Sequence, residues 1–127
     1  MTNAATSPLD VAERLFAAIE RGDVDAVREL YAPDVEVWHN YDNLAQSRDQ
    51  NLRTLAWMVK NVADRRYEEV RRRPIPGGVL QQHVLRGTAP NGAQLNVPSC
   101  MLVTVVDGRV TRIQEYLDSA QFAVLRA

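Results

Sequence analysis

Residues 95–117 read LNVPSCMLVTVVDGRVTRIQEYL, two mostly apolar runs joined at Asp107 and Gly108. An Asp-Gly pair between two runs rich in strand-forming residues is a strong signal for a tight β-hairpin. We therefore expect two antiparallel strands here, at residues 95–106 and 110–117. The last third of the chain is thus predicted to consist mainly of two strands joined by a short turn, and this hairpin decides the fold.

Two further strands are expected just before this hairpin, at residues 67–73 and 79–88. Proline and glycine cluster at residues 74–78 and again at 90–92, and such clusters mark turns. The second half of the chain is therefore predicted to be a four-stranded antiparallel meander, followed by a short helix near the C-terminus.

The first half carries three helix signals. Ser7 is followed by a proline and then by apolar residues at helical spacing, which is typical of a helix start. Gly22 is expected to end this helix and Asp23 to cap a second one that runs toward Pro33. Ser47 opens a third helix with a capping box. Helices followed by antiparallel strands indicate the α+β class.

Composition limits the kinds of function. The chain has 127 residues and a net charge of -1, which gives no reason to expect nucleic acid as a partner. We expect one domain over residues 1–127 and no linker. Cys100 is the single cysteine, so an intrachain disulfide is impossible. No apolar run could span a membrane, and residues 1–7 do not resemble a secretory signal, so a cytoplasmic location is expected.

Two ionisable side chains fall on faces that should be apolar. A short strand at residues 35–40 places His39 on the same face as two valines, because alternate residues of a strand share a face. In the last strand, Glu115 shares a face with an isoleucine and a leucine. A buried ionisable group must be paired, neutralised or functional. His39 and Glu115 are therefore the main candidates for functional residues.

Four local stretches resemble a known family. These are Arg-Gly-Asp at 21–23, YAPDV at 31–35, DGRV at 107–110 and EYLD at 115–118. Together with the order of elements, they resemble the SnoaL-like branch of the nuclear transport factor 2 superfamily. Its relatives include ketosteroid isomerases, polyketide cyclases, limonene epoxide hydrolases and scytalone dehydratases. The resemblance implies a cystatin-like cone: a curved antiparallel sheet wrapped by three N-terminal helices around one pocket.

The same resemblance suggests catalytic roles. His39 falls where ketosteroid isomerases carry their general-base aspartate. A histidine side chain ordinarily titrates near pH 6.5 and can take the same role. The implied cone would bring the two strands to the same cavity, so we expect His39 and Glu115 within hydrogen-bond reach, directly or through one water. Glu115 would then orient the His39 ring and stabilise its charged form. The alternative is that His39 is a structural histidine of the core, with Glu115 as its partner.

The departures from the family argue against two familiar reactions. Ketosteroid isomerases hold the enolate with a tyrosine on the first helix and an acid on the fourth strand. Here Leu15 or Phe16 stands at the first place, and residues 100–102 carry no acid. Steroid isomerisation of the usual kind is therefore not expected. Residues 82–88 lack the aspartate of limonene epoxide hydrolases, which argues against that hydrolysis as well.

Five other residues are expected to bind the substrate: Phe16, Tyr41, Trp57, His83 and Met101. Trp57 lies opposite the apolar stripe of the third helix, which suggests a pocket lip, an interface or a half-covered surface position. His83 either joins His39 in the pocket or lies at a sheet-to-sheet contact, and the contact is the more common place for such a residue.

The leading interpretation is a small-molecule enzyme that transfers protons on an apolar, cyclic substrate: an isomerase, cyclase or dehydratase (a lyase). The alternatives are a non-catalytic domain that binds a small ligand and a dimerisation domain of the same fold. We expect no cofactor and no metal site, although two histidines and a carboxylate are a known ligand set. A homodimer is expected through the open sheet face, because the curved sheet carries mixed polar and apolar residues on both faces, including Val84, Val97 and Tyr116.

Overall fold

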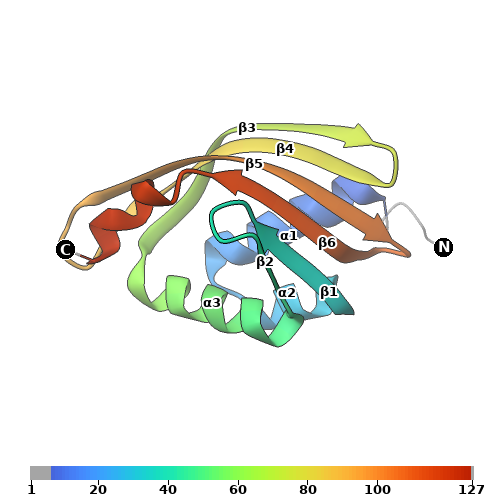
Figure 1. The fold of residues 1–127 in the computed structure, drawn as a ribbon, viewed down its shortest axis with the longest axis horizontal. Coiled ribbons are helices and arrows are strands. Elements are labelled where there is room, and N and C mark those ends of the chain that lie inside the picture. Colours follow the sequence, from blue (N-terminus) through green and yellow to red (C-terminus); the bar gives the residue numbers. More distant parts are fainter. Residues whose placement is uncertain (1–6, 127) are drawn as a thin grey trace.

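The computed structural model describes residues 7–126 and confirms the α+β class (Figure 1). Helices dominate its first half and strands its second half. In chain order the elements are α1 (Pro8–Arg21), α2 (Val24–Leu30), β1 (Tyr31–His39), β2 (Leu44–Gln46), α3 (Arg48–Asn61), β3 (Ala63–Ile75), β4 (Gly78–Thr88), β5 (Gln94–Val106), β6 (Arg109–Leu117) and the 3₁₀ helix η2 (Ser119–Arg126).

The helix boundaries follow from local chemistry, as predicted. Ser7 accepts a hydrogen bond from a backbone N–H in the first turn of α1 (3.2 Å), and Asp23 does the same for α2 (3.0 Å). Gly22 ends α1 in the left-handed conformation, with φ of 78°. Ser47 and Gln50 form both hydrogen bonds of a capping box on α3. The local sequence therefore sets where these helices begin and where α1 ends.

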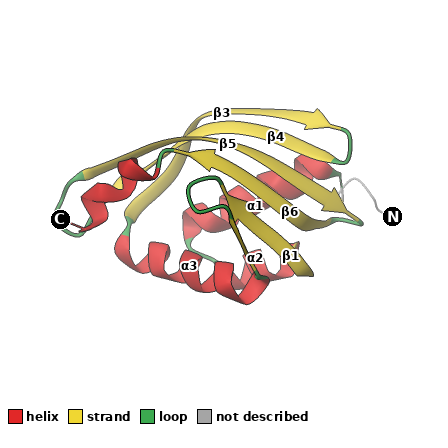
Figure 2. Ribbon diagram, viewed as in Figure 1, coloured by secondary structure: helices red, strands yellow, loops and turns green. Residues whose placement is uncertain are grey.

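The strands form one curved sheet in the order β2-β1-β6-β5-β4-β3. The pairs from β3 to β6 are antiparallel, as is β1 with β2, but β1 runs parallel to β6. β2 was not expected from the sequence. In Figure 2 the helices lie on the concave side of the sheet, with α1 beneath the long strands and α3 across the lower edge. The concave face is therefore the covered one.

The first strand begins earlier than the sequence indicated. α2 ends at Leu30 and β1 starts at Tyr31, so Pro33 lies inside the strand and does not end the helix. A proline has no N–H to give to a β-ladder. The register of β1 against β6 shifts between Tyr31 and Glu36, which is where Pro33 lies. The irregularity accommodates the missing donor.

The three residues named for the mixed sheet faces lie on both sides of the sheet. Val97 is 1% exposed and packs inside, with Leu85 as its cross-strand partner. The next pair along the strands, Val84 with Pro98, faces outward, and Tyr116 is exposed as expected. Cross-strand partners share a face of a sheet, so the burial of Leu85 places Val97 inside as well.

Within residues 7–126, no helix has the length and apolar character needed to cross a membrane. Residues 1–6, on which the comparison with secretory signals largely depends, lie outside the described part of the chain.

Candidate functional site

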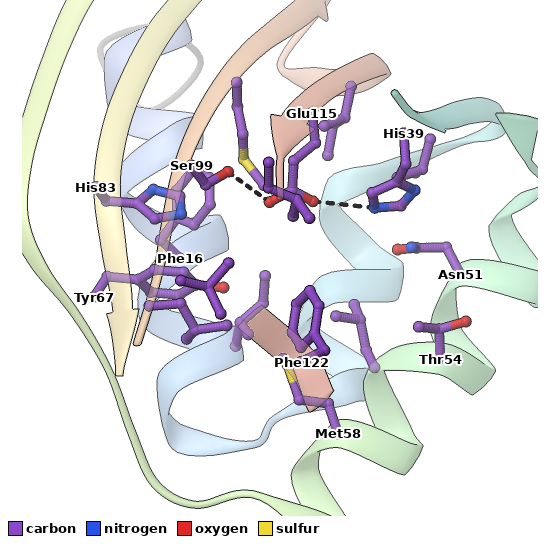
Figure 3. A pocket seen from close by; sticks show the side chains of 18 of the residues that line it. Phe16, His39, Asn51, Thr54, Met58, Tyr67, His83, Ser99, Glu115 and Phe122 are labelled. Atoms are coloured by element: carbon purple, nitrogen blue, oxygen red, sulfur yellow. Dashed lines mark hydrogen bonds and ion pairs between the residues drawn. The ribbon is translucent and has the colours of Figure 1, made fainter. Parts of the chain in front are cut away.

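An ionisable pair lies on the inner face of the sheet where β1 and β6 run side by side (Figure 3). His39 is the last residue of β1, and the parallel register pairs it with Glu115 of β6. The His39 Nε2 atom lies 3.0 Å from Glu115 Oε1, and the two side chains are 10% and 14% exposed. The predicted contact between these two side chains is confirmed.

A third polar residue, Ser99 of β5, completes the group. Its hydroxyl donates a hydrogen bond to Glu115 Oε2 over 2.8 Å, so each carboxylate oxygen has one donor (Figure 3). The sequence analysis missed Ser99, although a signal was present. Ser99 shares a strand face with Val97 and Met101, and it is the polar residue between them. A lone serine on an apolar face could have been added to the candidates.

These side chains lie in the wall of a cavity of about 510 Å³. Most of the other lining side chains are aliphatic or aromatic. All seven residues that the sequence marked as candidates line this cavity: Phe16, His39, Tyr41, Trp57, His83, Met101 and Glu115. The structure therefore brings the candidates together, while their roles in binding or catalysis stay predictions.

Two aromatic residues mark the open side of the cavity. Tyr41 and Trp57 line it and are nevertheless 47% and 51% exposed. The Tyr41 ring is centred 5.2 Å from the imidazole of His39. Burial raises the pKa of Tyr41, and the charges of Asp42 and Glu115 raise it further. Tyr41 therefore presents a neutral phenol next to His39 at the cavity mouth.

His83 lies in the pocket and not on the outer face. It is 4% exposed, and its ring makes edge-on contacts with Phe16 (5.6 Å between centres) and Tyr67 (4.6 Å). Burial lowers the pKa of His83 to about 4, with the Glu115 carboxylate opposing the change and the Arg72 guanidinium adding to it. His83 is therefore neutral at pH 7, and of the two open alternatives the structure selects the pocket.

A second polar chain, also missed from the sequence, supports the cavity from α3. The Tyr31 hydroxyl donates to Asn51 Oδ1 (2.7 Å), and Asn51 Nδ2 donates to Gln46 Oε1 (2.9 Å). Burial raises the pKa of Tyr31 above its ordinary value, so the phenol keeps its proton. Asn51 adjoins the apolar stripe of α3, but nothing in the sequence indicates that its partner is a tyrosine twenty residues earlier.

In the described residues 7–126, no three or more His, Cys, Asp and Glu side chains are grouped so that they could hold a metal ion. The polar groups at this site are an imidazole, a carboxylate and a hydroxyl, which are linked to one another by hydrogen bonds. Such a chain suits the movement of a proton.

Comparison with known proteins agrees with this architecture. Residues 12–113 match the family of SnoaL-like domains. The uncharacterized protein Rv0034 of Mycobacterium tuberculosis is 30% identical over 126 residues, which cover 85% of this chain and 86% of that protein.

Solved structures show the same fold at low identity. A candidate polyketide cyclase from Xanthomonas campestris superposes with a TM-score of 0.80 at 20% identity, covering 94% of this chain and 96% of that one. The candidate polyketide cyclase IdmH from Streptomyces antibioticus also gives 0.80 at 20% identity, with 94% and 98% covered. The family match spans most of the sequence and the fold match nearly all of it, so the chain belongs to the family of SnoaL-like domains.

Proposed function

We propose that this domain is an enzyme that transfers protons on an apolar, cyclic, carbonyl-bearing substrate bound in the cavity. The reaction would be an isomerisation, a cyclisation or a dehydration. One observation carries the proposal: Ser99, Glu115 and His39 form a hydrogen-bonded chain in the wall of a mostly apolar cavity of about 510 Å³. The similarity to candidate polyketide cyclases agrees with it at the level of the fold.

The directions of the hydrogen bonds to Glu115 indicate which atom acts as the base. An ionised carboxylate only accepts hydrogen bonds, so Ser99 Oγ–H and His39 Nε2–H both donate to Glu115. A neutral His39 ring with its proton on Nε2 carries its lone pair on Nδ1. In the proposal, Nδ1 removes a proton from the carbon next to the carbonyl group. The Glu115 carboxylate then stabilises the imidazolium that forms.

The alternative functions fit less well. A pure dimerisation domain has no need for a cavity of about 510 Å³. A passive binding domain would gain little from a buried carboxylate, because removing its charge from water costs free energy that apolar contacts do not. The pair of His39 and Glu115 therefore favours the catalytic proposal over both alternatives.

The proposal is tested by exchange of carbon-bound protons. The ketone 2-tetralone is incubated with the protein in D₂O, and loss of its α-proton signals is followed by NMR. We expect exchange above the buffer rate. His39→Gln should slow it by about 10²–10⁴-fold, because the amide still donates to Glu115 but is not a base. Its melting temperature should change little.

Glu36→Gln is the matched control, since Glu36 lies on the outer side of the same strand in an exposed pair with Arg112. This variant should exchange like the wild type. No exchange above buffer by the wild-type protein, with 2-tetralone bound, would contradict the proposal. Equal exchange by His39→Gln would do the same, and a large drop in its melting temperature would make His39 a structural residue.

We also propose that the outer face of the sheet pairs with a second copy of the chain. Tyr116 is 44% exposed there, and its ring makes an edge-on contact with Trp38 (5.3 Å). Sedimentation at micromolar concentration should give twice the 14.3 kDa monomer mass. Tyr116→Arg should shift the species to the monomer, whereas Val106→Arg, at an exposed hairpin position, should not. A wild-type species of monomer mass alone refutes the dimer.

A further inference from the structure

His83 ends a hydrogen-bonded chain that enters the cavity from the β3–β4 side. Arg72 of β3 is the cross-strand partner of Gln81 on β4, and its Nε atom lies 2.5 Å from Gln81 Oε1. Gln81 Nε2 lies 2.8 Å from His83 Nδ1, and Gln81 is fully buried. The guanidinium also lies over the Phe16 ring, 5.7 Å from its centre. Arginine, glutamine and histidine are thus held in one arrangement.

The donors in this chain determine where the His83 proton is. A guanidinium only donates, so the Gln81 atom that faces Arg72 is the amide oxygen. The amide nitrogen therefore faces His83 and donates to Nδ1, which must carry a lone pair. In a neutral imidazole the proton then sits on Nε2. The opposite tautomer would set one N–H against another, and so would a protonated ring.

We propose that His83 is a second catalytic residue, a neutral imidazole whose Nε2–H donates a hydrogen bond to the carbonyl oxygen of the substrate. Gln81 and Arg72 are its positioning residues. This inference rests on the proposed function, and it names the substrate class as enolisable carbonyl compounds. When His39 removes the α-proton, negative charge develops on that oxygen, and a fixed donor stabilises it.

The location of His83 suits this role. Its ring lies on one side of the cavity and His39 on the other, with Glu115 between them (Figure 3). In the sheet, β6 and β5 separate β1 from β4, and both histidines line the same cavity of about 510 Å³. Ketosteroid isomerases use a tyrosine and an acid as hydrogen-bond donors to this oxygen. Here Leu15 or Phe16 stands at the tyrosine position and residues 100–102 carry no acid, so the His83 donor takes their place.

The surroundings of His83 keep its ring neutral. Phe16 from α1 and Tyr67 from β3 pack edge-on against it, and Arg72 from β3 is the nearby cation. Glu115 from β6 is the facing carboxylate, and it acts in the opposite direction. Burial raises the pKa of Tyr67, so that phenol adds no charge. A neutral imidazole donates a hydrogen bond to the substrate oxygen and keeps its proton.

The tautomer is measured directly by ¹⁵N NMR of the imidazole rings. The chain has two histidines, and the His39→Gln variant leaves His83 alone in the spectrum. We expect a neutral ring with the proton on Nε2 from pH 5.5 to 8. Gln81→Glu should place a carboxylate against Nδ1, move the proton there and bring the titration into this pH range. Gln82→Glu, at the exposed neighbouring position, should leave the spectrum unchanged. A wild-type proton on Nδ1 overturns the inference.

The donor role is tested with 2-naphthol, whose oxygen imitates an enolate oxygen, against naphthalene, which has none. The wild-type protein should bind 2-naphthol more tightly. His83→Phe should reduce the ratio of the two affinities about fivefold to tenfold, the usual size of one lost hydrogen bond. It should leave naphthalene binding nearly unchanged. An unchanged ratio overturns the inference.

The two proposals fail separately. If proton exchange of 2-tetralone depends on His39 but the ratio of the 2-naphthol and naphthalene affinities is the same in His83→Phe, the proposed function stands and His83 is not the donor. If the wild type does not speed exchange but the naphthol ratio depends on His83, the donor stands and the proton-transfer function fails. His83→Asn, which keeps an N–H donor, should restore part of the ratio lost in His83→Phe.

Discussion

Arg65→Met is expected to lower the free energy of unfolding by roughly 3–5 kcal/mol, because one guanidinium serves two helix ends. Its nitrogen atoms donate to the carbonyl oxygens of Ile19 (3.3 Å), Glu20 (3.2 Å), Val59 (3.0 Å) and Val62 (2.6 Å). These carbonyls belong to the C-terminal ends of α1 and α3, where a positive charge is favoured. Methionine fills similar space but removes the guanidinium from all of these acceptors, of which Ile19 O keeps a backbone donor, the Gly22 N–H (3.1 Å). Urea denaturation measures the change.

Arg66→Met is the control for this experiment. Arg66 is the next residue on β3 and pairs with Asp64 (2.8 Å) and Glu68 (3.3 Å) near the surface. Exposed ion pairs contribute little, so a change below about 1 kcal/mol is expected. If Arg65→Met and Arg66→Met destabilise equally, the two helix ends do not depend on Arg65.

Leu15→Asp is expected to abolish cooperative folding. Leu15 of α1 is 0% exposed in the main apolar core. An aspartate there would place an unpaired carboxylate among apolar groups. The cost is comparable with the whole stability of a small domain, about 5–15 kcal/mol. Thermal unfolding followed by circular dichroism should show no transition.

Two further leucines calibrate that result. Leu9→Asp, at a 40% exposed position of the same helix, should melt close to the wild type. Leu117→Asp should keep a cooperative transition with a loss of about 2 kcal/mol, because Leu117 is only half-buried and faces the cavity. A cooperative melt of Leu15→Asp near the wild-type temperature would show that its assigned place in the core is wrong.

The alternation of residues predicted which side chains of a strand face inward, and this was enough for the main pair. His39 and Glu115 were placed on core faces because each shares its side of a strand with apolar residues. Alternation has a period of two and says nothing about which strands are neighbours. In β4, alternation did not decide which face of the strand is buried. The side of the sheet on which His83 lies became clear only from its packing against Phe16 and Tyr67.

By itself, the sequence determined the α+β class, the starts of the three helices and the inward faces of the first and last strands. Capping side chains and alternate residues act within a few positions along the chain, so a local pattern contains this information. Tertiary structure alone decided that β1 pairs in parallel with β6, which brings His39 to Glu115 across 76 residues. It also decided that Ser99 reaches the carboxylate and that Arg72 orients Gln81 toward His83. These contacts join strands that are distant in the sequence, and their partners are set by the order of strands in the curved sheet.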